Sequence, residues 1–241
     1  MTYVLYLDRY HLGDPLFLTG FARDVQHLGA PCVLVHGAGE AAERALEAQG
    51  RFPTFDGGVL RVESTEDRRI VARAARELNR QIVHTLNEAG VAAVGIEASG
   101  RGLLQRAEGG ILAKKVTWLR DLVAQGAVPV VTALLPGPSG EAEEVNGGAV
   151  AGALALALTD SGMPAVATFL TKNGQNGLYS GDRRIDEAAM DAVTEGVVPE
   201  PEALRDGHAA GAEVTITSRS GLRSAPVLAT RIRPETAKKT P

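Results

Sequence analysis

Short apolar runs alternate with longer amphipathic segments along most of the chain. Most of the short runs are rich in Val or Leu and lack a strict alternation of apolar and polar residues, which is typical of strands covered on both faces. They predict six strands, at Tyr3–Leu7, Pro31–Val35, Ala92–Ile96, Val128–Ala133, Ala165–Leu170 and Glu213–Thr217. The amphipathic segments predict helices at Leu16–Leu28, Glu40–Gln49, Ser64–Ala89, Thr117–Gln125 and Gly148–Leu158.

Strands interleaved with helices predict an α/β protein, a three-layer αβα sandwich around a central, mainly parallel sheet of about eight strands. We expect one domain over residues 1–233, in two lobes of about residues 1–135 and 140–233, and then a polar tail at residues 234–241. Pro136–Ser139 is a candidate hinge between the lobes, and a surface loop is the alternative. Glycine and proline gather in the segments predicted to be loops, among them Phe52–Gly58, Ser99–Gly110, Pro136–Gly148 and Asn173–Gly181.

Composition narrows the class of protein. Hydrophobic residues make up 44 % of the chain and charged residues 22 %, which is ordinary for a globular protein. A net charge of −4 argues against nucleic acid or an anionic membrane as the partner. No apolar run reaches the ~18 residues of a membrane span, and no signal sequence opens the chain, so we expect a cytoplasmic protein.

The first candidate site follows a predicted strand. His36 ends the strand, and Gly37, Ala38 and Gly39 form a small-residue turn before a helix. Such a turn lets an anionic ligand approach backbone N–H groups at the positive end of the helix dipole. A tight turn without a ligand explains the same residues. The turn matches neither a Walker A motif nor the dinucleotide fingerprint G-x-G-x-x-G. A dinucleotide-dependent oxidoreductase therefore ranks a distant third among the candidate functions.

Two more motifs follow along the chain. Arg61 lies just after the two glycines of the Asp56–Val62 segment, where its guanidinium is well placed to form two parallel hydrogen bonds with a carboxylate. An ordinary surface arginine is the alternative. Asn146 precedes an Ala-rich helix and either caps that helix or presents its amide to a ligand.

The order of these motifs resembles a known family. A strand ending in H-G-x-G, a G-x-x-R-V turn and N-x-x-A before an Ala-rich helix are similar to the N-acetylglutamate kinases of the amino acid kinase family. The similarity extends from about Val4 to Ile232, through matches at Leu78-Asn79, Val91–Ile96, Val128–Val131 and Ala229–Ile232.

The resemblance implies an αβα enzyme that transfers a phosphoryl group from MgATP to a substrate carboxylate and forms an acyl phosphate. It implies that the Gly37–Gly39 turn cradles the transferring phosphate or the substrate carboxylate, that Arg61 clamps the substrate, and that Asn146 lies beside the reacting groups. Thr171, Lys172 and Gly174 fall on the nucleotide side, and Arg205 takes the place of a family lysine. Mg²⁺ then arrives with ATP without a dedicated protein site, and the protein is expected to form a homodimer or higher homo-oligomer.

The chain departs from this family at its first strand. The family motif K-x-G-G is replaced by Tyr6-Leu7-Asp8-Arg9, which leaves Arg9 as the candidate cation. The family's N-x-N-A-D aspartate falls on Gly148.

Two hypotheses therefore stay open. One is an acetylglutamate-type kinase of arginine or lysine biosynthesis, acting on an N-acylated acidic amino acid such as N-acetylglutamate or on carrier-linked aminoadipate. The other is a catalytically impaired relative that binds a small acidic ligand and serves as a regulatory or scaffold subunit.

Overall fold

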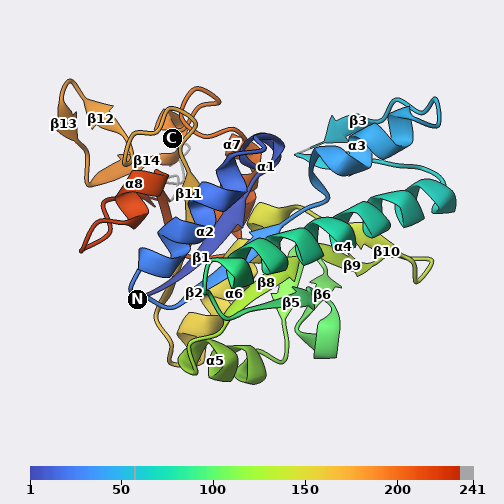
Figure 1. Cartoon of the computed structure of the whole chain (residues 1–241), viewed down its shortest axis with the longest axis horizontal. Coiled ribbons are helices and arrows are strands. Elements are labelled where there is room, and N and C mark those ends of the chain that lie inside the picture. Colours follow the sequence, from blue (N-terminus) through green and yellow to red (C-terminus); the bar gives the residue numbers. More distant parts are fainter. Residues whose placement is uncertain (57, 234–241) are drawn as a thin grey trace, which may run out of the picture.

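The computed structural model describes residues 1–56 and 58–233, so the expected polar tail at 234–241 lies outside the described residues. Eight strands form one central sheet in the order β14-β16-β15-β11-β1-β2-β8-β5 (Figure 1). Their bounds are β1 Thr2–Leu7, β2 Cys32–His36, β5 Ala93–Glu97, β8 Val128–Thr132, β11 Ala165–Leu170, β14 Glu187–Ala189, β15 Val214–Thr217 and β16 Thr230–Arg233. Neighbouring strands run parallel except β15 and β16, which are antiparallel. The predicted mainly parallel sheet of about eight strands is confirmed.

Helices cover both faces of this sheet. Side chains of α5 (Thr117–Ala124), α6 (Gly147–Asp160) and α7 (Pro201–Ala209) share one apolar cluster with Val4 and Tyr6 of β1. Side chains of α2 (Phe17–His27) and α4 (Thr65–Glu88) share another cluster with Leu5 and Leu7. Successive β1 residues thus enter opposite cores, as expected for a strand covered on both faces, and the αβα sandwich is confirmed. A third apolar cluster lies between α3 (Gly39–Glu47) and α4.

Short elements stand where the sequence predicted loops. Four two-stranded hairpins extend from the sheet: β3 Thr54–Asp56 with β4 Val59–Arg61, β6 Leu104–Ala107 with β7 Gly110–Ala113, β9 Leu134–Pro136 with β10 Ala142–Glu144, and β12 Tyr179–Ser180 with β13 Arg183–Arg184. The remaining short helices are α1 Arg9–Gly13, α8 Arg219–Leu222 and the 3-10 turns η1 Gly100–Gly102 and η2 Met190–Ala192. Each hairpin strand has only two to four residues, too few for a periodic pattern to appear in the sequence.

Helix α7 is also absent from the sequence prediction, and its packing explains why. Its buried residues are Pro201, Ala203, Leu204 and Gly207, so its inner face carries little apolar signal. Small residues suffice there because α6 and α7 touch through their backbones. A Cβ added to Gly148 would lie 1.8 Å from the Ala203 carbonyl oxygen, and one on Gly152 would lie 2.1 Å from the Gly207 carbonyl oxygen.

We predict that Gly148→Ala lowers the free energy of unfolding by about 3 kcal/mol, at the upper end of the usual cost of overpacking, because the neighbouring atom is backbone and must move. Urea denaturation measures the change. Gly196→Ala is the matched control, since its Cβ would meet only the Thr194 hydroxyl, at 3.6 Å, and should change the unfolding free energy far less. Equal effects of the two substitutions would contradict close α6–α7 packing.

Candidate functional site

A cleft lies at the carboxyl ends of β1 and β2. Leu7 and His36 are register partners, so the chain leaves both strands at the same edge of the sheet, where ligand sites of open α/β sheets gather. The cleft is lined by the end of β1, α1, the glycine turn, the β3–β4 hairpin and two glutamates: Tyr6, Leu7, Arg9, Leu12, Gly37, Gly39, Phe55, Gly58, Leu60, Glu144 and Glu200. The hollow left between them is only ≈ 10 Å³. It holds one water molecule at most, so side chains fill the cleft.

The glycine turn is fixed by a buried histidine. The His36 ring is fully buried, and burial lowers its pKa to about 4, so the ring is neutral at physiological pH. Its Nδ1 lies 2.7 Å from the Gly37 carbonyl oxygen and its Nε2 lies 3.0 Å from the Asn79 amide nitrogen. The consistent tautomer has Nδ1–H donating to Gly37 while Nε2 accepts from Asn79. His36 therefore orients the turn.

Glu144 occupies the place where the sequence predicts an anionic ligand. Its Oε1 accepts a hydrogen bond from the Ala38 N–H, and its carboxylate also accepts one from the Leu60 N–H. A Cβ on Gly37 would lie 2.3 Å from that same oxygen, so glycine is required for the approach. Burial raises the pKa of Glu144 to about 7, although the two N–H donors favour its ionised form. The turn therefore binds a carboxylate of the same chain, the side chain of Glu144.

A second glutamate is bound to Tyr6. The Tyr6 hydroxyl donates to Glu200 Oε2 at 2.6 Å, and the Arg9 N–H donates to Glu200 Oε1 at 3.2 Å. Burial, and then the charge and hydrogen bond of Glu200, raise the pKa of Tyr6 well above its usual 10. Burial also raises the pKa of Glu200. Tyr6 is therefore a neutral hydrogen-bond donor.

The two glycines after Asn146 accommodate this arrangement. A Cβ on Gly147 would lie 2.3 Å from the Tyr6 ring, and a Cβ on Gly148 would clash with the α7 backbone. Any side chain at position 148 therefore requires α7 to move.

Arg9 and Asp8 are engaged in other contacts. The Arg9 guanidinium pairs with Glu43 at 2.9 Å and lies 3.8 Å from the centre of the Phe55 ring, a cation–π contact. Asp8 is buried and caps α1, accepting from the His11 N–H at 2.9 Å and lying 2.7 Å from His11 Nδ1.

Among the predicted substrate residues, those of the glycine turn line or face the cleft, whereas Asn146 and Arg61 are not among its lining residues. Gly37 and Gly39 line the cleft, and the Ala38 N–H faces Glu144. Asn146 caps α6 by accepting from the Ala149 N–H at 3.0 Å. Arg61 follows the buried Leu60 in β4 and points to the other face of the hairpin, where its 66 % exposed side chain pairs with Asp56.

The predicted nucleotide-side residues follow β11 or lie on α7. The Thr171 hydroxyl donates to the Gln175 carbonyl at 2.6 Å within its own loop, which bends back at Gly174 with φ +73°. The Lys172 ammonium lies 5.0 Å from the centre of the Tyr10 ring. Arg205 lies 3.7 Å from Glu202, one turn earlier on α7, with about half of its side chain exposed.

Sequence reasoning did not identify the two cleft glutamates as site residues. Glu200 lies directly before Pro201, a proline at the first turn of a helix, which is the only local signal that it begins an element. Over residues 1–56 and 58–233, no group of three or more His, Cys, Asp and Glu side chains is arranged to hold a metal ion.

Glu144 makes the free energy of unfolding depend on pH. Its raised pKa means that the folded state binds the proton more tightly than the unfolded chain does. The resulting stability is fully present below pH ~4.5 and is lost as the pH rises to about 7. Glu144→Gln removes this dependence and keeps an oxygen to accept the Ala38 N–H. We expect the stability of the variant relative to wild type to grow by about 2–3 kcal/mol between pH 5 and pH 8, at ~1.4 kcal/mol per pKa unit.

Urea denaturation at the two pH values measures this growth. The exposed Glu195, changed to Gln, controls for the loss of one carboxyl group elsewhere. A Glu144→Gln difference that is the same at both pH values would show that Glu144 titrates normally.

Comparisons with known proteins place the chain among its relatives. It is 34 % identical over 227 residues to an acetylglutamate kinase of Deinococcus radiodurans, with 85 % of each chain covered. It is 30 % identical over 220 residues to an acetylglutamate kinase of Saccharopolyspora erythraea, with 79 % of this chain and 70 % of that one covered.

Solved structures share the fold. An N-acetylglutamate synthase from Neisseria gonorrhoeae, complexed with coenzyme A and N-acetyl-glutamate, superposes with a TM-score of 0.70 at 20 % identity. That match covers 98 % of this chain, which spans 60 % of the synthase. A Giardia carbamate kinase matches with a TM-score of 0.60 at 14 % identity, over 97 % of this chain and 99 % of that one. The model of the amino acid kinase family matches residues 11–195, more than half of the chain, and the protein is a member of that family.

Proposed function

We propose that this amino acid kinase family member is catalytically impaired, binds a small acidic ligand in the cleft between the glycine turn and the β3–β4 hairpin, and acts as a regulatory or scaffold subunit. The observation that supports this most directly is the Glu144 carboxylate on the Ala38 N–H. The same backbone N–H groups can donate to the carboxylate of a ligand in its place.

The charges in the cleft argue against transfer of a phosphoryl group. Phosphoryl transfer depends on positioning and on cations that neutralise the phosphate oxygens. Here Tyr6 replaces the family lysine, Glu200 and Glu144 face the same hollow, and Arg9 is paired with Glu43. Two like charges ~4 Å apart repel by ~1–4 kcal/mol at dielectrics between water and a protein surface. The residues in the cleft therefore do not fit the phosphates of MgATP.

An ATP-dependent kinase acting on the side-chain carboxylate of an N-acylated acidic amino acid is the alternative. The names of the relatives favour it, since two proteins about 30 % identical to this chain are acetylglutamate kinases. It requires a rearranged site in which another cation, such as Lys172 or Arg205, serves the nucleotide.

The proposed ligand replaces Glu144 on the turn. Its carboxylate takes over the N–H donors of Ala38 and Leu60, and Glu144 turns out of the cleft. The Glu144 carboxylate stands at the position proposed for the ligand carboxylate, and the hollow beside it is small.

Measurement of ADP release with N-acetylglutamate and MgATP tests the absence of turnover, with the Deinococcus radiodurans relative as the positive control. Removing one charged transition-state contact costs about 10²–10³-fold in rate, so we expect this chain to be slower than its relative by at least that factor. Turnover comparable to the relative's would refute the impaired assignment and support the kinase.

Calorimetric titration with N-acetylglutamate tests the ligand site. Glu144→Ala vacates the turn and should bind the ligand at least tenfold more tightly than wild type. Glu143→Ala is the matched control, because Glu143 lies on the same strand but pairs with Arg68 and Arg106 away from the cleft. No binding by wild type or either variant would reject N-acetylglutamate as the ligand.

A further inference from the structure

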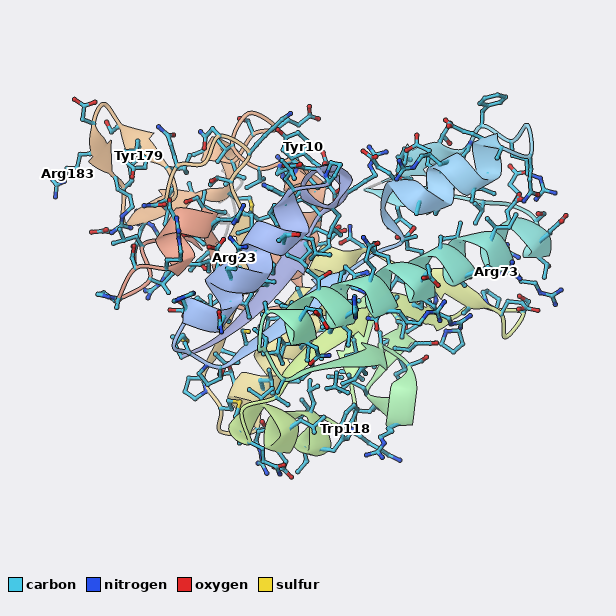
Figure 2. All side chains as sticks on the ribbon, viewed as in Figure 1. Tyr10, Arg23, Arg73, Trp118, Tyr179 and Arg183 are labelled. Atoms are coloured by element: carbon cyan, nitrogen blue, oxygen red, sulfur yellow. The ribbon has the colours of Figure 1, made fainter. Side chains whose placement is uncertain are left out.

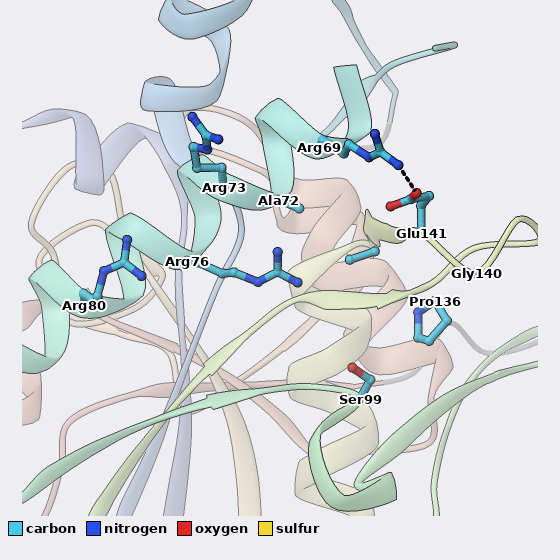
Figure 3. Close-up of a pocket in the computed structure, with 10 residues that line it drawn as sticks. Arg69, Ala72, Arg73, Arg76, Arg80, Ser99, Pro136, Gly140 and Glu141 are labelled. Atoms are coloured by element: carbon cyan, nitrogen blue, oxygen red, sulfur yellow. Dashed lines mark hydrogen bonds and ion pairs between the residues drawn. The ribbon is translucent and has the colours of Figure 1, made fainter. Parts of the chain in front are cut away.

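A large hollow among the described residues lies away from the cleft and is lined with arginines. It has a volume of ≈ 620 Å³, between the outer face of α4 and the β9–β10 hairpin (Figure 3). Arg69, Arg73, Arg76 and Arg80 line it from α4, at a spacing of four, three and four residues that keeps them along one side of the helix. Ser99 and the backbone around Gly140 line the remaining walls. We call this feature the arginine groove.

Most of the arginines in the groove are held by single surface carboxylates. Arg69 pairs with Glu141 at 2.7 Å and Arg76 pairs with Glu97 at 2.6 Å, while Arg80 pairs with Glu77 on its own helix. The Arg73 side chain, on the same helix, forms no ion pair or hydrogen bond with another side chain in the described part of the chain. Such exposed pairs contribute little to stability, so an incoming anion can exchange with them at small cost.

The charge balance of this region differs from that of the whole protein. Nearby, Arg68 and Arg106 both pair with Glu143 on the hairpin. The groove and its rim thus gather six arginines against the glutamates at 77, 97, 141 and 143, an excess of positive charge in a chain of net charge −4. An excess of one sign within a hollow attracts the opposite charge.

The spacing of the arginines indicates the size of the ligand. Arg69 and Arg80 are eleven residues apart, which corresponds to about 16 Å along a helix axis. A single phosphate can bridge neighbouring arginines only, whereas a molecule with several charged oxygens along its length reaches more of them. Arginine is well suited to this role, because its planar fork binds phosphate and carboxylate oxygens in pairs.

We propose that the arginine groove binds a small multivalent oxyanion, a chain of phosphates or a polycarboxylate, through Arg73 and Arg76, the middle two of the four arginines along α4. Figure 3 shows the Arg76 side chain extending from α4 across the hollow on the side of Pro136 and Ser99. The inference uses no residue of the cleft and holds whether or not the protein is catalytic.

Calorimetric titration of the full chain with inorganic tripolyphosphate and with citrate at low ionic strength tests the proposal and distinguishes the two kinds of oxyanion. We expect at least one of them to bind, with affinity falling as salt is added. Arg73→Gln combined with Arg76→Gln should weaken that binding at least tenfold. Arg73→Gln alone should weaken it several-fold, and since Arg73 has no partner to lose, the folded state should be unaffected.

Arg183→Gln is the matched control. Arg183 is exposed on the β12–β13 hairpin at the opposite end of the molecule from Arg73 (Figure 2), so the same loss of charge there should leave the affinity unchanged. Arg76→Lys keeps the charge without the fork and should give an intermediate affinity. Failure of both anions to bind, or equal weakening by Arg183→Gln, would overturn the proposal.

Discussion

The backbone contact between α6 and α7 is the constraint on which the cleft depends. Because Gly148 and Gly152 carry no side chain, the carbonyls of Ala203 and Gly207 approach α6 closely. This contact fixes where α7 begins, and the residue before α7 is Glu200. Glu200 in turn accepts hydrogen bonds from the Tyr6 hydroxyl and the Arg9 N–H. The packing of α6 against α7 therefore determines which charged side chains line the cleft.

In the cleft, burial and hydrogen bonding shift the pKa of Glu144 in opposite directions. Glu144 loses water on entering the cleft, which favours its protonated form, while the N–H groups of Ala38 and Leu60 favour the carboxylate. Burial is the larger effect, and the carboxyl group is left near its titration midpoint at neutral pH. At neutral pH the protonated and ionised forms of Glu144 are therefore both populated.

Sequence patterns predicted the sheet and its covering helices because doubly buried strands are recognisable from their apolar runs. The β11 prediction matches the structure at both ends. In the glycine turn, for which an anionic ligand is the expectation, the Ala38 N–H donates to the Glu144 carboxylate of the same chain. Sequence patterns could not predict that Glu144 binds the glycine turn. Glu144 is 106 residues from Ala38, and Glu200 is 194 residues from Tyr6, so neither pair shares a local pattern. Helix α7 was missed for a related reason, since its inner face needs only small residues against α6.

The buried histidine beneath the glycine turn has a consequence for how the protein responds to acid. His36 remains neutral down to a pH of about 4, so its hydrogen bonds to Gly37 and Asn79 persist when the surroundings become mildly acidic. Glu144 gains its proton much earlier, near pH 7. Mild acidification therefore protonates Glu144 while the glycine turn keeps its conformation. The competition between Glu144 and a stronger acid for the N–H groups of the turn then depends on pH.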